Sequence, residues 1–350
     1  MKRNVMPEES GDSAWFSRFN AFEQQETRRQ VEYKRRRWPE LGDGVWSKNP
    51  DISYPHILPA GNLENAFYHP IARLTLDYCY RYDIQLHSEA LNLKSSQVCC
   101  FNFLFPLRQD PDLAVEVLGS LLPGVDKITA IEFEYTGPEE ATQWLGEPKD
   151  GGRGRNRTSI DAAIWWESKG TRHLTLVEWK YTESGYGACG GYHSKWNKAP
   201  QRCDELDPLD QGAAQSCYLT QGRNNRRYWE RLREAGIDLT VLADMGGCPF
   251  KGPFYQLLRQ HLLAAYLRTT DKDLIVDVAA VNFRGNESVK AVDREIGKIA
   301  GTVSEAWNRA LCGVPEFRCV EAEAITSCLR ASKQGGAVSL ATYLKERYGV

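Results

Sequence analysis

The sequence contains no long hydrophobic run and no strong excess of charge of either sign. No window approaches the roughly 18 uninterrupted apolar residues that a membrane helix requires, and the stretch from Met1 to Glu9 lacks the apolar core of a secretory signal. Lys and Arg number 44 and Asp and Glu number 46, so the formal net charge is −2. We therefore expect a cytoplasmic protein with no membrane partner, in which any nucleic-acid binding comes from local basic patches.

Motifs for nucleotide binding and for tight zinc binding are also lacking. No Walker loop is present and no glycine fingerprint follows a strand, so nothing supports nucleotide chemistry. The ten cysteines are expected to be reduced, and none of them forms a Cys-X-X-Cys pair. Zinc at Cys189, His193 and Cys203, with Cys217 or Cys248 further on, is disfavoured by this loose spacing, and reduced structural cysteines are preferred.

What is present is the composition of a folded protein. The 350 residues are 42% hydrophobic and 26% charged, which argues against disorder and leaves room for two domains or one enlarged domain. We predict three regions. They are a helical N-terminal extension over 1–89, a core over 90–285 with an insertion near 184–210, and a C-terminal helical region over 286–350 packed on the core.

Hydrophobic periodicity predicts alternating helices and strands. Helices are expected over 13–37, 64–82, 95–105 with an interruption at Pro106, 111–122, 211–235 and 252–268. Strands are expected over 127–135, 160–166, 174–180, 238–242 and 274–283. The polar stretch 167–172 contains glycine and predicts a hairpin turn between the second and third of these strands.

This hairpin carries the clearest chemical signal. Glu178 and Lys180 are two residues apart on a strand and share one face, and pairing places Asp161 opposite residues 178–180. A magnesium ion would resolve the cost of placing two carboxylates in an apolar sheet. From the spacing alone, a cross-strand salt bridge on a solvated face is an equally good interpretation. The apolar residues on both sides and the position at one end of the hairpin favour a site.

The arrangement resembles the PD-(D/E)XK nuclease superfamily, the restriction-endonuclease-like fold. The α/β core of that family runs helix, three-stranded meander, helix, strand. The predicted elements follow that order over residues 90 to 245, with 211–234 as the second helix and 238–242 as the last strand. The segments Asn92–Gln97 and Cys100–Asn102 also look like the first core helix of a bacterial restriction-endonuclease branch. The chain departs from the family name at Ile160, which replaces the proline.

The resemblance implies site roles and a cofactor. Asp161 and Glu178 would bind the metal, the carbonyl of Trp179 would complete the inner shell, and Lys180 would be the catalytic lysine. Magnesium is the implied ion, and manganese is its substitute. Gln97, and Gln211 at the start of the second predicted helix, are candidates for hydrogen bonds that orient the metal ligands. Gln256 and Arg259, on an amphipathic helix, are weaker ones.

Arginines supply candidate phosphate contacts. Arg153, Arg155 and Arg157 lie in a glycine-rich segment that leads directly into the Asp161 strand. A solvated loop is the alternative. Two further basic runs are Arg223–Arg227 and the arginines between Arg28 and Arg37, where interleaved glutamates favour a solvated helix.

The sequence thus predicts a magnesium-dependent endodeoxyribonuclease that hydrolyses DNA phosphodiester bonds, with a restriction or phage-defence role suggested by the resemblance. A homodimer is compatible with this predicted function. Two alternatives stay open. One is a non-cleaving nucleic-acid-binding protein on the same fold, and the other is a nuclease that acts on RNA.

Overall fold

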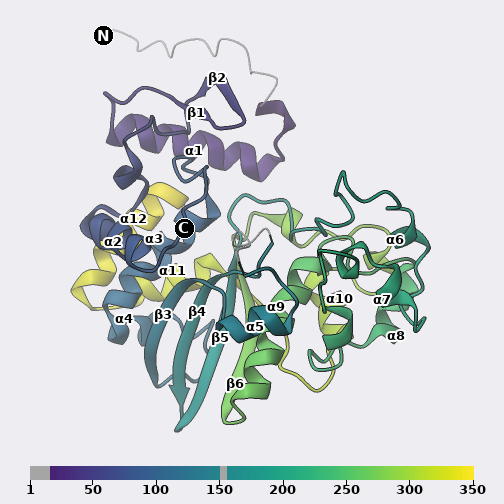
Figure 1. The fold of residues 1–350 in the computed structure, drawn as a ribbon. Helices are drawn as coiled ribbons and strands as arrows, with labels where there is room; N and C mark the ends of the chain where they lie inside the picture. Colours follow the sequence, from purple (N-terminus) through teal and green to yellow (C-terminus); the bar gives the residue numbers. More distant parts are fainter. Residues whose placement is uncertain (1–15, 150–155) are drawn as a thin grey trace, which may run out of the picture.

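A five-stranded mixed sheet forms the centre of the computed structural model, which describes residues 16–149 and 156–350 (Figure 1). The strand order is β3-β4-β5-β6-β7. The strands are β3 (Lys127–Tyr135), β4 (Ile160–Ser168), β5 (Thr171–Trp179), β6 (Leu274–Asn282) and β7 (Arg318–Glu321). The first three are antiparallel neighbours, whereas β6 joins β5 and β7 joins β6 in parallel.

The β4–β5 hairpin closes through a two-residue turn. Ser168 pairs with Thr171, and the two residues between them, Lys169 and Gly170, have φ angles of 49° and 79°. Positive φ at both positions is the geometry of the hairpin turns that match strand twist, and glycine adopts it without a steric penalty. The turn fixes the register of the hairpin, which places Ala162 opposite Val177.

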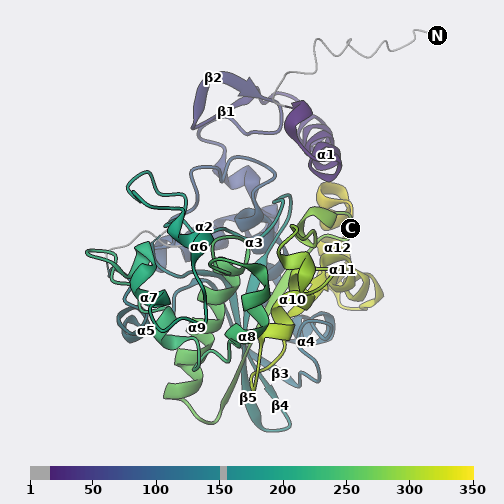
Figure 2. The ribbon, with the colours of Figure 1, turned by 90° about the vertical axis from the view of Figure 1, so that its right-hand side faces the viewer.

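Helices cover both faces of the sheet (Figures 1 and 2). One face packs against α2 (Ala72–Arg81), α3 (Ser96–Gln109), α4 (Pro111–Val117), α11 (Ala322–Ala331) and α12 (Gly335–Tyr348). The other packs against α5 (Glu139–Trp144), α8 (Leu239–Leu242), α9 (Phe254–Thr270) and α10 (Val303–Ala310). Trp179 points into the first core, where its ring lies 4.9 Å from that of Phe103. Leu176 points into the second core.

The N-terminal region joins the C-terminal end of the chain. Helix α1 (Ala21–Arg37) lies along α12, and Gln30 Nε2 donates to the carbonyl oxygen of Arg347 at 2.8 Å. A small hairpin of β1 (Gly44–Trp46) and β2 (Asn49–Tyr54) follows α1 (Figure 2). The region predicted as a helical extension therefore also contains strands, and the C-terminal region contributes β7 to the sheet.

Short elements complete the described chain. Two further four-residue helices, α6 (Arg202–Glu205) and α7 (Ala213–Ser216), lie between β5 and α9 together with α8. The 3-10 helices are Phe16–Arg18, Leu63–Ala66, His69–Ile71, Tyr218–Thr220, Trp229–Arg231, Ala243–Met245, Glu287–Val289 and Ile296–Lys298. No helix in the described ranges is long and apolar enough to cross a membrane.

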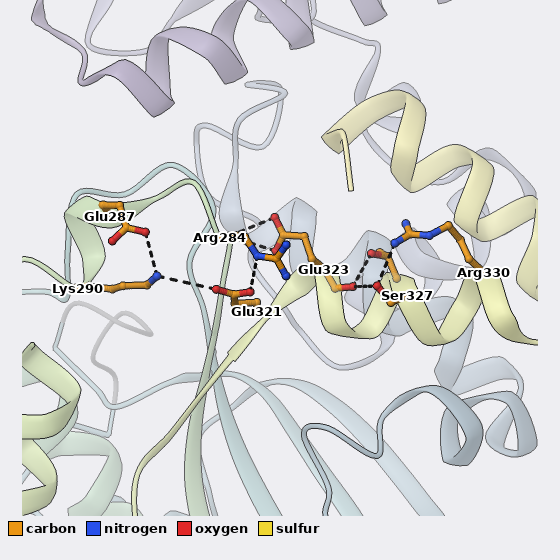
Figure 3. Close-up of polar contacts among 8 residues, drawn as sticks. Arg284, Glu287, Lys290, Glu321, Glu323, Ser327 and Arg330 are labelled. Atoms are coloured by element: carbon orange, nitrogen blue, oxygen red, sulfur yellow. Dashed lines mark hydrogen bonds and ion pairs between the residues drawn. The ribbon is translucent and has the colours of Figure 1, made fainter.

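Ion pairs fasten the turn after β6 to the edge of the sheet (Figure 3). Arg284 Nε donates to Glu321 at 2.7 Å, and the backbone N–H of Arg284 donates to the carboxylate of Glu323 at the start of α11. Lys290 bonds Glu287 at 3.0 Å and lies 4.0 Å from Glu321. The loop after β6 is thereby held beside β7, which keeps it close to the end of β5.

The predicted fold class is confirmed, and three of the predicted elements are wrong. The helix expected over 211–235 is broken because Gly222 and Asn225 adopt φ angles of 57° and 45°, outside the helical region. The strand expected over 238–242 is the short helix α8, because Asp238 accepts the N–H of Thr240 at 2.9 Å and caps it. Helix α3 continues through Pro106, whose buried neighbours pack on the sheet. The crossover between β5 and β6 is instead made by α9.

Candidate active site

Asp161, Glu178 and Lys180 meet at one end of the β4–β5 hairpin. Continuing the register by one residue from the Ala162–Val177 pair sets Asp161 opposite Glu178, on the face of the sheet that α9 covers. Asp161 Oδ2 accepts the backbone N–H of Trp179 at 2.7 Å, which ties the two strands together at this point. Lys180 Nζ lies 2.8 Å from Glu178 Oε1. Two carboxylates and one ammonium therefore share one small volume.

Two glutamines of α9 hold the carboxylate of Glu178. Gln256 Nε2 donates to Oε1 at 2.6 Å, and Gln260 Nε2 donates to Oε2 at 2.5 Å. The two glutamines are four residues apart, so they project from one side of the helix. Gln256 Oε1 also accepts Lys180 Nζ at 3.1 Å. Because Glu178 is 4% exposed, these bonds fix its orientation without competition from water.

Burial and neighbouring carboxylates both disfavour the charged form of Asp161. Loss of solvent raises the pKa of Asp161 well above its usual range, and the neighbouring carboxylates of Glu178 and Glu134 raise it further. The ammonium of Lys180 and the N–H of Trp179 act in the opposite direction without reversing the shift. The metal-free site therefore holds more carboxylate than its own positive charge can balance.

Lys180 remains charged despite being buried. Burial alone would lower its pKa, but the carboxylates of Glu178, Glu183 and Asp161 outweigh that effect and raise the pKa above its ordinary value. A lysine in this state donates hydrogen bonds and stabilises negative charge, and it is not a proton acceptor at neutral pH.

The donor set fits a hard divalent cation. Magnesium takes oxygen ligands and is usually bound through one or two carboxylates while it keeps several waters. Asp161 and Glu178 supply two carboxylates, and the excess negative charge around Asp161 calls for a cation. Among the described residues, no group of three or more His, Cys, Asp or Glu side chains is arranged to hold a metal ion. The fit therefore depends on two carboxylates with backbone and water oxygens.

A cavity of about 990 Å³ lies beyond the end of β5. It is lined by residues of α1, of the loop before α3, of the segment after β5 and of the loop after β6. Tyr186 lines this cavity, and its ring centre is 5.5 Å from Lys180 Nζ. Asn286 bonds the carbonyl oxygens of Tyr181 and Glu183, at 3.0 and 2.8 Å, and so shapes the wall nearest the site.

Of the other residues predicted for the site, some contact groups beside Asp161 or the end of β3, and others do not. Gln97 Nε2 donates to Glu134 at 2.5 Å, and Glu134 is one of the two carboxylates that raise the pKa of Asp161. Arg157 donates to Thr136 Oγ1 at 3.1 Å, beside the end of β3. Arg153 and Arg155 lie outside the described residues. Gln211 is exposed and precedes the short helix α7, so the prediction that it opens the crossover helix is wrong.

Sequence reasoning missed or undervalued three contributors. Gln256 was a weak candidate, and Gln260 and Glu134 were not recognised as site residues. A signal for the glutamines was available, since their four-residue spacing places two polar groups on one side of a leucine-rich helix. Glu134 gave no such signal. Its φ of 50° lies outside the usual strand region although β3 continues through it, and this local geometry could not be read from periodicity.

Comparison with known proteins gives one match. A family model described as "Restriction Endonuclease associating with ARP" matches residues 23–349, which is nearly the whole chain. No curated protein and no solved structure matches the chain significantly.

Proposed function

Because the chain belongs to the family described as restriction endonucleases associating with ARP, we propose that it is a metal-dependent endonuclease that hydrolyses DNA. The observation that carries this proposal is the convergence of Asp161, Glu178 and Lys180 at the end of the β4–β5 hairpin. This is the set of groups that the PD-(D/E)XK resemblance implies, and it lies on a sheet of the matching topology.

In the proposed reaction, each residue has a separate task. Asp161, Glu178 and the carbonyl of Trp179 would hold a magnesium ion, or manganese in its place. When bound, the ion supplies Lewis-acid stabilisation and an acidified water. Lys180, held charged by Glu178, donates to a phosphate oxygen and stabilises the negative charge that develops there. Gln256 and Gln260 keep Glu178 in one orientation, so that no reorganisation is needed during the reaction.

The charge of the cavity lining leaves the phosphate contacts of a substrate to basic residues elsewhere in the chain. Its lining contains four acidic residues and two lysines, so the lining does not by itself attract a polyanion. The lysines are Lys48 and Lys94, and Lys94 is paired with Glu23 at 2.8 Å. We therefore assign the phosphate contacts to the arginine segment that contains Arg153, Arg155 and Arg157.

The proposal is tested with purified protein and supercoiled plasmid. Nicked or linear DNA should appear with magnesium or manganese, and a chelator should prevent it. Asp161→Asn, Glu178→Gln and Lys180→Met should each abolish cleavage, and their near-ultraviolet circular dichroism should verify that they are folded. An exposed change far from the site, Arg330→Ala, serves as the active control.

Other outcomes select between the alternatives. Cleavage of RNA but not of plain or modified DNA would mean that the protein is a nuclease that acts on RNA. Tight, metal-independent binding of nucleic acid without cleavage of any substrate would mean that the protein binds nucleic acid and is not an enzyme. Full activity of the Lys180→Met variant would remove the catalytic assignment.

A further inference from the structure

A second cavity, of about 400 Å³, adjoins the one beyond the end of β5. Its walls come from the start of α1, the β1–β2 hairpin and the chain just before α3 (Figures 1 and 2). The two cavities share four lining residues, which are Glu23, Glu89, Lys94 and Thr182. Thr182 is two residues beyond Lys180, so their backbones are within about 7 Å of each other. A ligand in this space, here called the side cavity, therefore sits next to the proposed catalytic site.

Four rings line the side cavity. They belong to Phe19, Trp46, Tyr54 and His56. Trp46 is half-buried, whereas Tyr54 and His56 are buried and their ring centres are 5.9 Å apart. Burial lowers the pKa of His56 to about 3, so its ring is uncharged at neutral pH. Aromatic faces stack on other planar rings, so this lining suits a flat aromatic ligand.

Backbone hydrogen bonds hold the side cavity in shape. The N–H of Gly44 in β1 donates to the carbonyl oxygen of Ile57 at 2.9 Å. Ile57 in turn forms a β-bridge with Asn92, and the N–H of Leu93 donates to the carbonyl oxygen of His56 at 3.1 Å. Three segments that are distant in sequence are thereby joined around the rings. A ligand that enters a cavity already in shape loses little free energy to ordering the protein.

The charges of the side cavity are balanced, which distinguishes it from a phosphate site. Its charged lining residues are Arg18, Lys94, Glu23 and Glu89. Lys94 Nζ bonds Glu23 at 2.8 Å and lies 3.8 Å from the centre of the Phe19 ring. This pair cancels, and one arginine and one glutamate remain. Because phosphate is bound where cationic groups are in excess, this lining favours an uncharged ligand.

Glu89 supplies a polar contact for the edge of such a ligand. Its Oε1 accepts the hydroxyl of Ser47 at 2.5 Å and that of Ser88 at 3.4 Å. Within the described ranges both bonds end on this oxygen, so Oε2 is available as an acceptor. A carboxylate accepts a hydrogen bond from the exocyclic amino group of cytosine, and adenine carries such a group too, whereas thymine does not. The side cavity therefore combines ring faces with an acceptor for an amino group.

We propose that the side cavity receives one cytosine or adenine base of the DNA, turned out of the duplex next to the bond that is cut. The inference rests on the proposed nuclease function, because the neighbouring site supplies the DNA. A base inside a duplex cannot reach a cavity in the protein, so its nucleotide rotates outward and loses its stacking and pairing. Stacking on Trp46 and a hydrogen bond to Glu89 offset that loss. The two side chains then determine which base is accepted beside the cut.

The first test measures the binding of short duplexes to the Asp161→Asn variant in calcium, which prevents cleavage. The duplexes carry a plasmid site that the natural protein cuts, with one mismatch placed at each position in turn. A mismatch at the extruded base should tighten binding by about 10-fold, because an unpaired base is easier to turn out. Adding Trp46→Ala should abolish this gain and weaken binding of the matched duplex roughly 5- to 150-fold. Trp46→Phe should retain most of the affinity. Val45→Ala is the control, since Val45 is the preceding residue of β1, is 51% exposed and does not line the side cavity.

The second test does not depend on cleavage. Saturation-transfer NMR is recorded on the natural chain with free deoxycytidine, deoxyadenosine and thymidine. The base protons of deoxycytidine or deoxyadenosine should receive saturation from the protein, and Trp46→Ala should remove this signal while Val45→Ala retains it. Glu89→Gln should reduce the preference over thymidine. Because Glu89→Gln keeps the shape of the side chain, it replaces Trp46→Ala in both tests if the latter does not fold.

The outcomes distinguish failure of this inference from failure of the proposed function. Plasmid cleavage without a mismatch effect, and with unchanged binding by the Trp46→Ala protein, would overturn the base site and leave the nuclease standing. A Trp46-dependent nucleoside signal from a protein that cleaves no nucleic acid would remove the nuclease and support a base-binding cavity. A protein that shows neither the mismatch effect nor a Trp46-dependent nucleoside signal would overturn the inference.

Discussion

Glu147 accepts two hydrogen bonds from Thr158, one from the backbone N–H at 2.7 Å and one from the hydroxyl at 2.6 Å. The two residues stand on either side of the arginine segment, so the segment is closed at its base. Tyr228 donates to the same carboxylate at 2.5 Å, and Arg259 of α9 donates to Thr158 Oγ1 at 3.2 Å. One helix therefore contacts both the Glu178 carboxylate and the base of the arginine segment.

Removing the Thr158 hydroxyl should destabilise the fold. Thr158→Val keeps the shape but leaves a buried carboxylate and a buried guanidinium each without one partner, which should lower the free energy of unfolding by about 1–3 kcal/mol. Chemical denaturation measures this change. Thr142→Val is the matched control, because the buried Thr142 hydroxyl has no hydrogen-bond partner in the described chain. Equal stability of the two variants would contradict a stabilising role for the hydrogen bonds of the Thr158 hydroxyl with Glu147 and Arg259.

Lys180 should contribute to stability as well as to cleavage. Lys180→Ala leaves Glu178 buried with only its amide partners, and the free energy of unfolding of the metal-free protein should fall by roughly 3 kcal/mol. The double variant Glu178→Gln, Lys180→Met removes both charges and should recover most of this loss without recovering cleavage. Denaturation with a chelator present makes the comparison. A stable Lys180→Ala protein would show that the pair is not buried as described.

The α9 glutamines should act through orientation of Glu178. Gln260→Ala should reduce cleavage by about 10- to 100-fold and weaken metal binding, as is typical when a hydrogen bond to a ligand is lost. Thr269→Ala, at the exposed end of the same helix, is the control. Cleavage rates and metal titrations are compared at equal folded fractions. If the substitution lowers the free energy of unfolding but leaves the cleavage rate and metal binding unchanged, Gln260 has only a structural role.

Metal-free stability should fall as the pH rises. The pKa of Asp161 is raised in the folded state, so between the unfolded value near 3.8 and the folded value the folded chain binds more protons than the unfolded one. The unfolding free energy therefore decreases with pH across this interval. Asp161→Asn should remove this slope and should be the more stable protein at neutral pH. Added magnesium should reduce the difference. Parallel pH profiles of the two proteins would refute the shift.

The arginine segment should govern DNA affinity through its charge. Changing Arg153, Arg155 and Arg157 to alanine should flatten the salt dependence of binding, by nearly one unit of log–log slope per lost contact, at every DNA sequence alike. Calcium replaces magnesium in the measurement to prevent cleavage. Metal binding should be unaffected. An unchanged slope would move the phosphate contacts to Arg223, Arg226 and Arg227 or to α1.

The local signals in the sequence were sufficient for the hairpin and insufficient for the crossover. Alternation and a glycine turn define β4 and β5, and their register follows, so Asp161, Glu178 and Lys180 could be brought together in advance. The sequence assigns the crossover helix and the strand that follows it to 211–242, whereas the structure uses α9 and β6. The apolar run after Asp238 misleads because it has no periodicity that separates a capped helical turn from a strand. Both true elements, α9 and β6, had been expected at nearly their observed positions.

Contacts between distant segments could not be predicted from periodicity. Glu134 lies between Phe133 and Tyr135, which pair with Ala162 and Ile160, so its position near Asp161 depends on the register between β3 and β4. Such contacts depend on tertiary packing, which local sequence patterns do not encode.

A hydrogen bond joins Gln30 to Arg347, which lies 317 positions further along the chain. The same side chain donates to the hydroxyl of Tyr181, one residue beyond Lys180, at 2.8 Å. During synthesis, α1 therefore emerges long before the helix on which it docks, and the strand that carries Glu178 waits for β6 and β7. A chain that stops before α12 therefore lacks the Arg347 carbonyl that accepts one of the two hydrogen bonds of Gln30, and α1 keeps only its contact with Tyr181 through this side chain.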